Sequence, residues 1–324
     1  MADATAFWVT APGHGELRRE ALPAPGPGEV LVETVASGIS RGTESLVFKG
    51  LVPDSQHEAM RAPHQAGSFA FPVKYGYSSA GVVTAGEAAW LGARVFSLHP
   101  HQDRYVVPVS AVRRIPDGVP DARAVLAANL ETAVNGLWDA APRIGDRIAV
   151  VGVGVIGMLA AALLAQIPGA SVEVIDVDPG KMRIAEALGL RLAAPDEAER
   201  DADVVIHTSG TAEGLETALR LAGFEAIVLE LSWYGVTPVT VPLGEAFHSR
   251  RLVLRSSQVG HVAGDRRARW DHGRRLGLAL CLLKDARFDA LLEPAVPFTR
   301  LPELMAHVLE PGSGAMCQVV SYGS

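Results

Sequence analysis

The sequence is poor in cysteine and has no excess of positive charge. Cys281 and Cys317 are the only cysteines among 324 residues, with no CxxC pair, which argues against a disulfide framework and against a zinc site built from cysteines. Acidic residues number 36 and basic residues 29, for a formal net charge of −7. No global positive field would therefore attract nucleic acid. The cysteine usage fits the cytoplasm, and the first residues, with Asp3 and Pro12, lack the pattern of a secretory signal.

Long hydrophobic runs are also scarce. The uncharged segment from Ile148 to Ala165 approaches the length of a membrane span. Spaced glycines interrupt its front half, which suits a buried strand and a tight turn better than a spanning helix. We therefore expect no membrane contact. The composition, 48% hydrophobic and 20% charged, is enough for a substantial core, and the length indicates about two domains.

Two patterns of secondary structure follow one another along the chain. Residues 1–115 contain short β-branched runs bounded by glycine and proline, which predict a β-rich domain. An alanine-rich helix is expected over 122–141, and an arginine-rich helix over 266–283. From Arg147 onward, apolar strands and helices alternate, which predicts an α/β doubly wound parallel sheet. We expect its strands at 147–151, 171–176, 203–207 and 225–231, its helices at 157–167, 179–188 and 212–222, and a closing strand of the chain around 317–321.

A glycine motif lies between the first expected strand of this sheet and the helix that follows. Its sequence is Gly152-Val-Gly154-Val-Ile-Gly157. Gly152 permits a tight turn, Gly154 lets a pyrophosphate approach the backbone, and Gly157 lets the helix pack closely on the strand. The N–H groups of the loop and of the first helical turn, with Val155 and Ile156, then face the phosphates. The motif predicts dinucleotide binding, although glycines that merely ease strand–helix packing are an alternative.

The second expected strand ends in an acidic residue, Asp176. An acid at the end of the second strand, after such a glycine motif, accepts hydrogen bonds from the ribose diol of adenosine and repels a 2′-phosphate, which favours NAD over NADP. The alternative is that Asp176 caps the next helix. Lys181 is placed to approach the ribose, or is an ordinary residue of the first helical turn.

Taken together, these motifs resemble the medium-chain dehydrogenase/reductase superfamily. The resemblance is carried by residues 27–32, 36–44, 72–83, 152–157, 207–211 and 251–257, and by Asp176 with Lys181. It implies a β-rich GroES-like catalytic domain, residues 1–128 with 257–324, into which a Rossmann domain, residues 129–256, is inserted. It also implies that Ser209 binds the cofactor, and that the chain forms a homodimer or homotetramer.

The chain departs from this superfamily at the catalytic zinc. Where relatives have a cysteine, a histidine with a glutamate, and a third ligand, this chain has Ser40, Tyr77 with Ser78, and Ala128 or Asn129. None of these is an ordinary zinc ligand. The cysteine-rich lobe of a structural zinc is also missing. The chain therefore looks most like the zinc-lacking branch of hydroxyethyl-bacteriochlorophyllide dehydrogenases, and we expect no zinc.

Without zinc, another group must hold the proton of the alcohol. Tyr77 is the first candidate, because it lies at the position of a zinc ligand and a phenol can donate to a developing alkoxide. Ser40 could hydrogen-bond the substrate oxygen. Thr43 resembles the hydroxyl residue that begins a proton relay in zinc enzymes, and Glu44 is an acidic alternative. Each of these residues could instead be structural.

Other polar residues are interpreted more simply. His99-Pro-His101 would put two histidines on one side of a strand, but no third ligand is evident, so surface or loop histidines are expected. Lys74 is expected to be solvated. The arginines between 266 and 275 are expected to form a solvated helix face. Trp233 and Tyr234 follow the last expected strand of the Rossmann sheet and could shape a substrate pocket or a subunit contact.

The sequence therefore predicts a zinc-independent, NAD-preferring oxidoreductase that interconverts an alcohol and a carbonyl in a cleft between the domains. Its substrate is a small molecule that the sequence does not identify. A first alternative is an NADPH-dependent enone or quinone reductase of the same superfamily. A second is a non-catalytic NAD(H)-binding sensor or scaffold.

Overall fold

The computed structural model describes residues 2–310 and 312–323 and divides the chain into two compact units. The first unit comprises residues 1–128, 276–286 and 292–324, and the second comprises residues 129–275 and 287–291. No helix in the described residues is long and apolar enough to cross a membrane.

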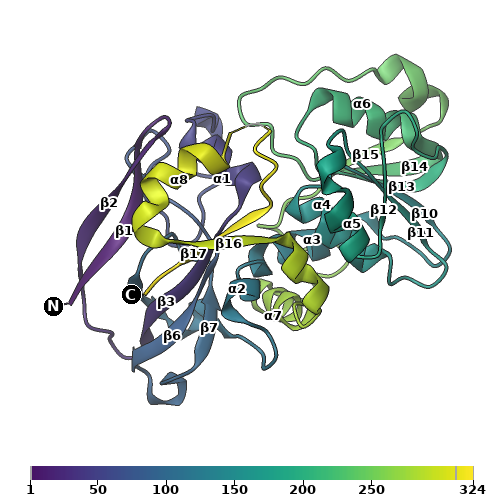
Figure 1. The fold of residues 1–324 in the computed structure, drawn as a ribbon. Coiled ribbons are helices and arrows are strands. Elements are labelled where there is room, and N and C mark those ends of the chain that lie inside the picture. The colour runs from purple at the N-terminus through teal and green to yellow at the C-terminus, as the bar shows by residue number, and fades with distance from the viewer. Residues whose placement is uncertain (1, 311, 324) are drawn as a thin grey trace. The chain divides into compact units, whose positions relative to one another are not determined.

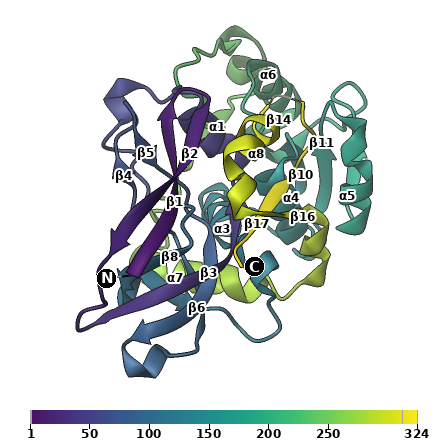
Figure 2. The same cartoon turned by 60° about the vertical axis from the view of Figure 1, so that its left-hand side comes forward.

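The first unit is built from two β-sheets. In one sheet the strand order is β2-β1-β5-β4, and in the other it is β16-β17-β3-β6-β7-β9, with β8 also paired to β3. Figure 2 shows the long paired strands β1 and β2 of the smaller sheet. The strands are β1 (Ala2–Ala11), β2 (His14–Leu22), β3 (Glu29–Ile39), β4 (Ala66–Gly67), β5 (Val73–Lys74), β6 (Ser79–Gly86), β7 (Arg94–Ser97), β8 (Arg104–Pro108), β9 (Val112–Arg114), β16 (Leu292–Pro297) and β17 (Cys317–Ser321).

Three short helices belong to this unit alone: α1 (Arg41–Phe48), α2 (Asp121–Ala124) and α8 (Leu301–Val308). Its core includes Val30, Val32, Val95 and Val112, which are completely buried. The alternation along β3 is clear in its first half, where Val30 and Val32 face the core and Leu31 and Glu33 are more exposed. Such alternation is typical of a sheet with one face against a core.

The second unit is a six-stranded parallel sheet with the strand order β12-β11-β10-β13-β14-β15. Helices α4, α5 and α6 pack on this sheet (Figure 1). The middles of the central strands are apolar, with Val150, Ile175, Ile206 and Val228 completely buried, as expected when helices cover a parallel sheet. The elements are β10 (Arg147–Val151), α4 (Val155–Leu164), β11 (Ser171–Ile175), α5 (Met182–Ala187), β12 (Arg191–Ala193), β13 (Ala202–His207), α6 (Ala212–Leu221), β14 (Ala222–Glu230) and β15 (Val253–Ser256).

Strand order reverses at the centre of this sheet. The chain proceeds from β10 to β11 and β12 on one side, and then to β13, β14 and β15 on the other. The carboxyl ends of β10 and β13 therefore form a topological switch point, which is where doubly wound sheets bind ligands. The residues that directly follow these two strands are Gly152 and Thr208.

The division between the units differs from the sequence-based boundaries at two points, because residues 257–275 and residues 287–291 belong to the second unit. The first boundary, after residue 128, agrees, but the return to the first unit lies at 276 and not at 257. Residues 257–275 stay with the second unit because Arg275, 1% exposed, donates from Nε to Glu131 Oε1 at 3.0 Å and also bonds the side chain of Asn135. Both partners lie on helix α3 (Ala127–Ala140), and Arg275 lies on helix α7 (His272–Leu282).

This buried ion pair also corrects the interpretation of the arginine-rich segment. Arg275 is a core residue, and the helix begins only at His272. Two arginines beside it stack on aromatic rings, Arg266 over Trp138 at 5.7 Å and Arg274 over Trp270 at 4.0 Å. The solvated face expected from the sequence is thus only partly present.

Candidate functional site

The glycine loop of the second unit has the geometry that its sequence predicts. Gly152 has a φ of +87°, and a Cβ there would collide with the backbone of Ser209. A Cβ at Gly157 would collide with the carbonyl of Gly152. Gly154 is the N-cap of α4, and a Cβ there would meet nothing within 4 Å.

The loop therefore fits a phosphate-bearing ligand. Because no side chain caps the first turn of α4, the N–H groups of that turn, which includes Val155 and Ile156, are available to an anion. The open side of Gly154 leaves room for the anion to approach the backbone. The residues that would hold a dinucleotide here are those of the motif and the acid that follows β11.

That acid, Asp176, is held in place by three donors. The N–H of Val153 and Lys181 Nζ bond its Oδ2 at 2.8 and 2.7 Å, and the N–H of Asp178 bonds its Oδ1 at 3.0 Å. The Asp176 side chain is 8% exposed and that of Lys181 is 18% exposed. A carboxylate can accept about four hydrogen bonds, so one acceptor position remains for a sugar hydroxyl. The ammonium group of Lys181 thus pairs with the carboxylate of Asp176 and offsets its negative charge.

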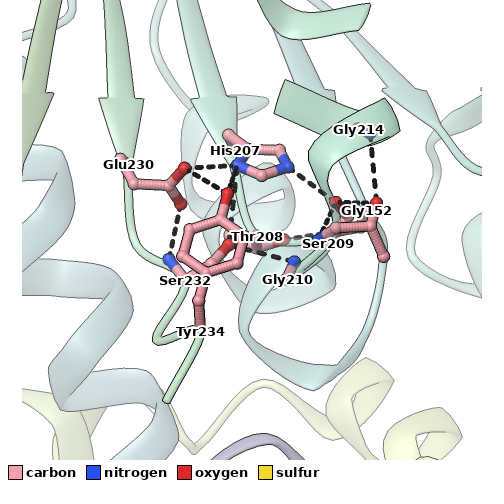
Figure 3. Close-up of polar contacts among 10 residues, drawn as sticks. Gly152, His207, Thr208, Ser209, Gly210, Gly214, Glu230, Ser232 and Tyr234 are labelled. Carbon is pink, nitrogen blue, oxygen red and sulfur yellow. Dashed lines mark hydrogen bonds and ion pairs between the residues drawn. The ribbon is translucent and has the colours of Figure 1, made fainter. Parts of the chain in front are cut away.

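A chain of polar side chains lies at the ends of β13 and β14, next to the glycine loop (Figure 3). His207 is completely buried, and its imidazole lies between Glu230 Oε2, 2.7 Å from Nδ1, and Ser209 Oγ, 2.6 Å from Nε2. The Tyr234 hydroxyl donates to the same Glu230 oxygen at 2.8 Å. Ser209 is thereby placed against Gly152, as a cofactor-binding residue would be.

In the first unit, the expected catalytic residues meet around one phenol. Tyr77 is half-buried and forms side-chain hydrogen bonds with Ser40 and Thr43. Burial and the nearby charge of Glu44 raise the pKa of Tyr77 to about 12, against the effect of those two bonds. The phenol is therefore neutral at physiological pH and keeps its proton.

Glu44 lies behind this group and is 2% exposed. Its Oε1 accepts the N–H of Ser40, the N-cap residue of α1, at 2.7 Å. Its Oε2 lies 3.0 Å from His101 Nε2, and His101 Nδ1 lies 2.7 Å from Ser37 Oγ, which in turn contacts the Tyr322 hydroxyl at 2.9 Å. Glu44 is thus one end of a buried hydrogen-bonded chain.

Two expectations for this unit are wrong. His101 is buried, with its imidazole enclosed by Glu44 and Ser37, and His99 is buried and stacks on Tyr105 at 3.7 Å. Lys74 is also buried, because Nζ donates to Glu20 Oε2 at 2.7 Å and to the side chain of Gln102. Polar partners distant in sequence satisfy His101 and Lys74 inside the unit, whereas His99 contacts the carbonyl of the adjacent Pro100.

The residues at the zinc-ligand positions of the superfamily have other partners. Ser78 Oγ donates to the carbonyl of Val125, and Tyr77 is a neutral phenol with a raised pKa. Neither is a donor that zinc selects. Within residues 2–310 and 312–323, no group of three or more histidine, cysteine, aspartate or glutamate side chains is arranged to hold a metal ion.

The sequence interpretation did not assign His101, His207 or Glu230 to these clusters. His207 and Glu230 end adjacent parallel strands and are register partners, so the strand assignments alone could have brought them together. Nothing local indicates His101, since its partners Ser37 and Glu44 lie far away in the sequence.

Comparison with known proteins supports the fold. No protein-family model matches the chain. D-guloside 3-dehydrogenase of Escherichia coli K12 is 30% identical over 208 residues, and this match covers 59% of the chain and 59% of the relative.

Solved structures are similar over nearly the whole length. L-idonate 5-dehydrogenase of Escherichia coli K-12 superposes with a TM-score of 0.80 at 15% identity, covering 99% of each chain. An alcohol dehydrogenase of Escherichia coli CFT073, in complex with NADH, has a TM-score of 0.78 at 16% identity, covering 99% of this chain and 100% of that one. The chain thus has the fold of these dehydrogenase structures, with a β-rich unit and a Rossmann-like unit.

Proposed function

We propose that the chain is an oxidoreductase of the medium-chain dehydrogenase/reductase superfamily that interconverts an alcohol and a carbonyl, with a preference for NAD and without a catalytic zinc. The observation that carries the proposal is the glycine loop at the switch point of the sheet, with its open Gly154 and the carboxylate of Asp176 beside it. When bound, the nicotinamide cofactor would supply or accept the hydride. The curated relative and the solved structures, named as dehydrogenases, support this reaction class.

The residues of the first unit support a proton-handling role around the substrate oxygen. In reduction, the neutral Tyr77 phenol would donate a hydrogen bond and then its proton to the carbonyl oxygen, and in oxidation the tyrosinate would take the proton of the alcohol. Ser40 and Thr43 hold the phenol through side-chain hydrogen bonds. Glu44, which bonds the backbone N–H of Ser40, would fix the position of that serine. The half-buried Tyr77 could release its proton to substrate and recover it from solvent.

Zinc independence is supported by the chemistry of the residues at the positions where zinc enzymes have their ligands. A serine, a tyrosine of raised pKa and a second serine bonded to a backbone carbonyl replace the ligands of zinc enzymes. The test is activity of metal-analysed protein in the presence of a strong chelator. Full activity without bound zinc supports the proposal, and activity that requires stoichiometric zinc contradicts it.

The NADPH-dependent reductase stays open as a second candidate because of one contact. Lys181 pairs with Asp176 at 2.7 Å, which reduces the repulsion that an isolated carboxylate would exert on a 2′-phosphate. Oxidation should therefore be assayed with NAD⁺ on secondary alcohols, polyols and sugar derivatives, the classes suggested by the names of the relatives. Enones and quinones should be assayed in parallel with NADPH. Turnover confined to the second panel would replace the proposal by the reductase.

We also propose a homodimer or homotetramer. The support is the resemblance and the outermost strand of the Rossmann sheet, β15, where Val253 and Leu254 are 43% and 37% exposed. An unpaired, apolar strand edge is a template for pairing with another chain. Solution mass measurement would test this, and a monomer at micromolar concentration would contradict it.

A further inference from the structure

The polar chain around His207 joins two neighbouring strands at the dinucleotide edge of the sheet. His207 ends β13 and Glu230 ends β14, and the two residues are register partners in the parallel sheet. The imidazole bonds Glu230 through Nδ1 and Ser209 through Nε2 (Figure 3). A fully buried imidazole with a partner on each nitrogen has a fixed orientation, so a change in its protonation must act through these two bonds.

The surroundings of His207 make Glu230 its charged partner. On β10 the residue in register is Val151, and on α6 the backbone of Gly214 approaches Nε2. After β14, the Ser232 and Tyr234 hydroxyls each lie 3.5 Å from Nδ1. The chemistry of the site thus depends on the imidazole and the Glu230 carboxylate, with the Tyr234 phenol as the third titratable group.

Glu230 is ionised in this arrangement. Burial acts to raise the pKa of Glu230, but its hydrogen bond and charge interaction with His207 and the N–H of Ser232 outweigh burial, so that its pKa lies below the usual value. The same environment raises the pKa of Tyr234, mainly through burial and the Glu230 charge. Glu230 therefore accepts the proton of His207 Nδ1 in a hydrogen bond, and Tyr234 remains a neutral donor to the same carboxylate.

The protonation of His207 decides which way the Ser209 hydroxyl donates. With a neutral imidazole whose proton is on Nδ1, Nε2 can only accept, and Ser209 Oγ must donate to it. With an imidazolium, Nε2 donates to Ser209 Oγ, and the serine proton turns outward. In the unliganded protein Thr211 Oγ1, 3.0 Å from Ser209 Oγ, can accept that proton. Ser209 is half-buried and lies against Gly152, where a dinucleotide on the glycine loop would pass.

We propose that His207, held by Glu230, is a proton-coupled positioning residue for the dinucleotide. Protonated His207 turns the Ser209 hydroxyl into a donor toward a phosphate or sugar oxygen of the ligand, so binding takes up a proton from solvent. The inference rests on the proposed function, because it requires a dinucleotide at the glycine loop. It adds a role for His207 and Glu230 that neither the fold nor the relatives assign.

Calorimetric titration of the full chain with NADH tests this directly. Heats measured at each pH in two buffers of different ionisation enthalpy give the number of protons exchanged on binding. The wild type should take up a fraction of one proton on binding NADH. Its affinity should fall as pH rises, by at most about tenfold per pH unit, because one proton is linked to binding.

Three variants separate positioning from a merely structural effect. Ser209→Ala leaves the imidazole in place but removes its link to the ligand, and should abolish proton uptake and weaken NADH binding at pH 6 by about tenfold or more. His207→Gln should also abolish the uptake. His248→Gln removes an exposed histidine of the same unit and should leave both the uptake and the affinity unchanged. If the buried His207 variant does not fold, Ser209→Ala alone decides.

The possible failures are distinguishable. NADH binding without proton uptake, or uptake that persists in Ser209→Ala, overturns this inference and leaves the proposed function intact. Absence of binding to both NADH and NADPH contradicts the proposed function, and the role of His207 is then refuted with it.

Discussion

Replacement of Tyr77 by phenylalanine removes one hydroxyl from the polar cluster of the first unit. The phenol forms hydrogen bonds with Ser40 and Thr43, and its pKa is raised to about 12. It is thus a neutral donor throughout the physiological range. Loss of one donor that stabilises a developing oxyanion lowers kcat by about 100-fold to 1000-fold. We expect Tyr77→Phe to reduce kcat by this amount on the best alcohol of the panel, with a smaller change in KM.

A matched variant distinguishes chemistry from stability. Tyr105 is also buried, and its hydroxyl donates to Ser79 Oγ at 3.1 Å. Tyr105→Phe should lower the free energy of unfolding by about 1 kcal/mol, as for any lost hydrogen bond, and leave kcat unchanged. Steady-state kinetics and urea unfolding on both variants complete the test. A Tyr77→Phe enzyme that retains more than half of the wild-type kcat would refute the assignment of Tyr77 as the donor.

Three further outcomes are expected. Asp176→Ala should shift the ratio of kcat/KM for NAD⁺ and NADP⁺ toward NADP⁺, because it removes a carboxylate and frees Lys181; an unchanged ratio would contradict the ribose assignment. Glu44→Ala should destabilise the protein by about 1–3 kcal/mol in urea unfolding, because it leaves the fully buried His101 without its hydrogen-bond partner, whereas an unchanged stability would show that the pair is unimportant. All five tyrosines have raised pKa values, so absorbance at 295 nm should show little ionisation of the native protein at pH 10. Tyrosines of the unfolded chain lose their protons at a lower pH than those of the native protein, so the free energy of unfolding should fall as pH rises above about 10. Native tyrosines that are half-ionised at pH 10 would contradict the raised pKa values.

The elements that the sequence predicted best are those with strong local signals. The apolar strand at 147–151 and the closing strand at 317–321 have the expected bounds. The glycine motif also has the expected turn, because the φ of Gly152 and the close packing at Gly157 follow from the local sequence. The expected helix over 122–141 is two helices, α2 and α3, separated at Val125 and Leu126. Strand β12, of three residues, was not expected, because so short a run carries little hydrophobic periodicity.

The polar clusters were harder to predict because their members come from distant parts of the chain. Ser40, Thr43 and Tyr77 were identified through the resemblance, and the structure brings them together. In contrast, His101 was interpreted as a surface residue, since no sequence pattern reveals that Glu44 and Ser37 enclose it. Burial of a polar side chain depends on the partners that the fold provides, which local propensity does not encode.

The central claim, that the Rossmann unit binds a nicotinamide dinucleotide, is tested most directly by thermal unfolding with NAD⁺, NADH, NADP⁺ and NADPH on protein of known metal content. A ligand at 100 times its Kd stabilises the native state by about 2.7 kcal/mol, which corresponds to a rise in Tm on the order of 5 °C. We predict this rise in Tm with NAD⁺ or NADH on zinc-free protein, and a smaller rise with NADP⁺ or NADPH. No rise with any of the four at millimolar concentration would contradict the account, and the glycine loop would then serve only the packing of α4 on β10.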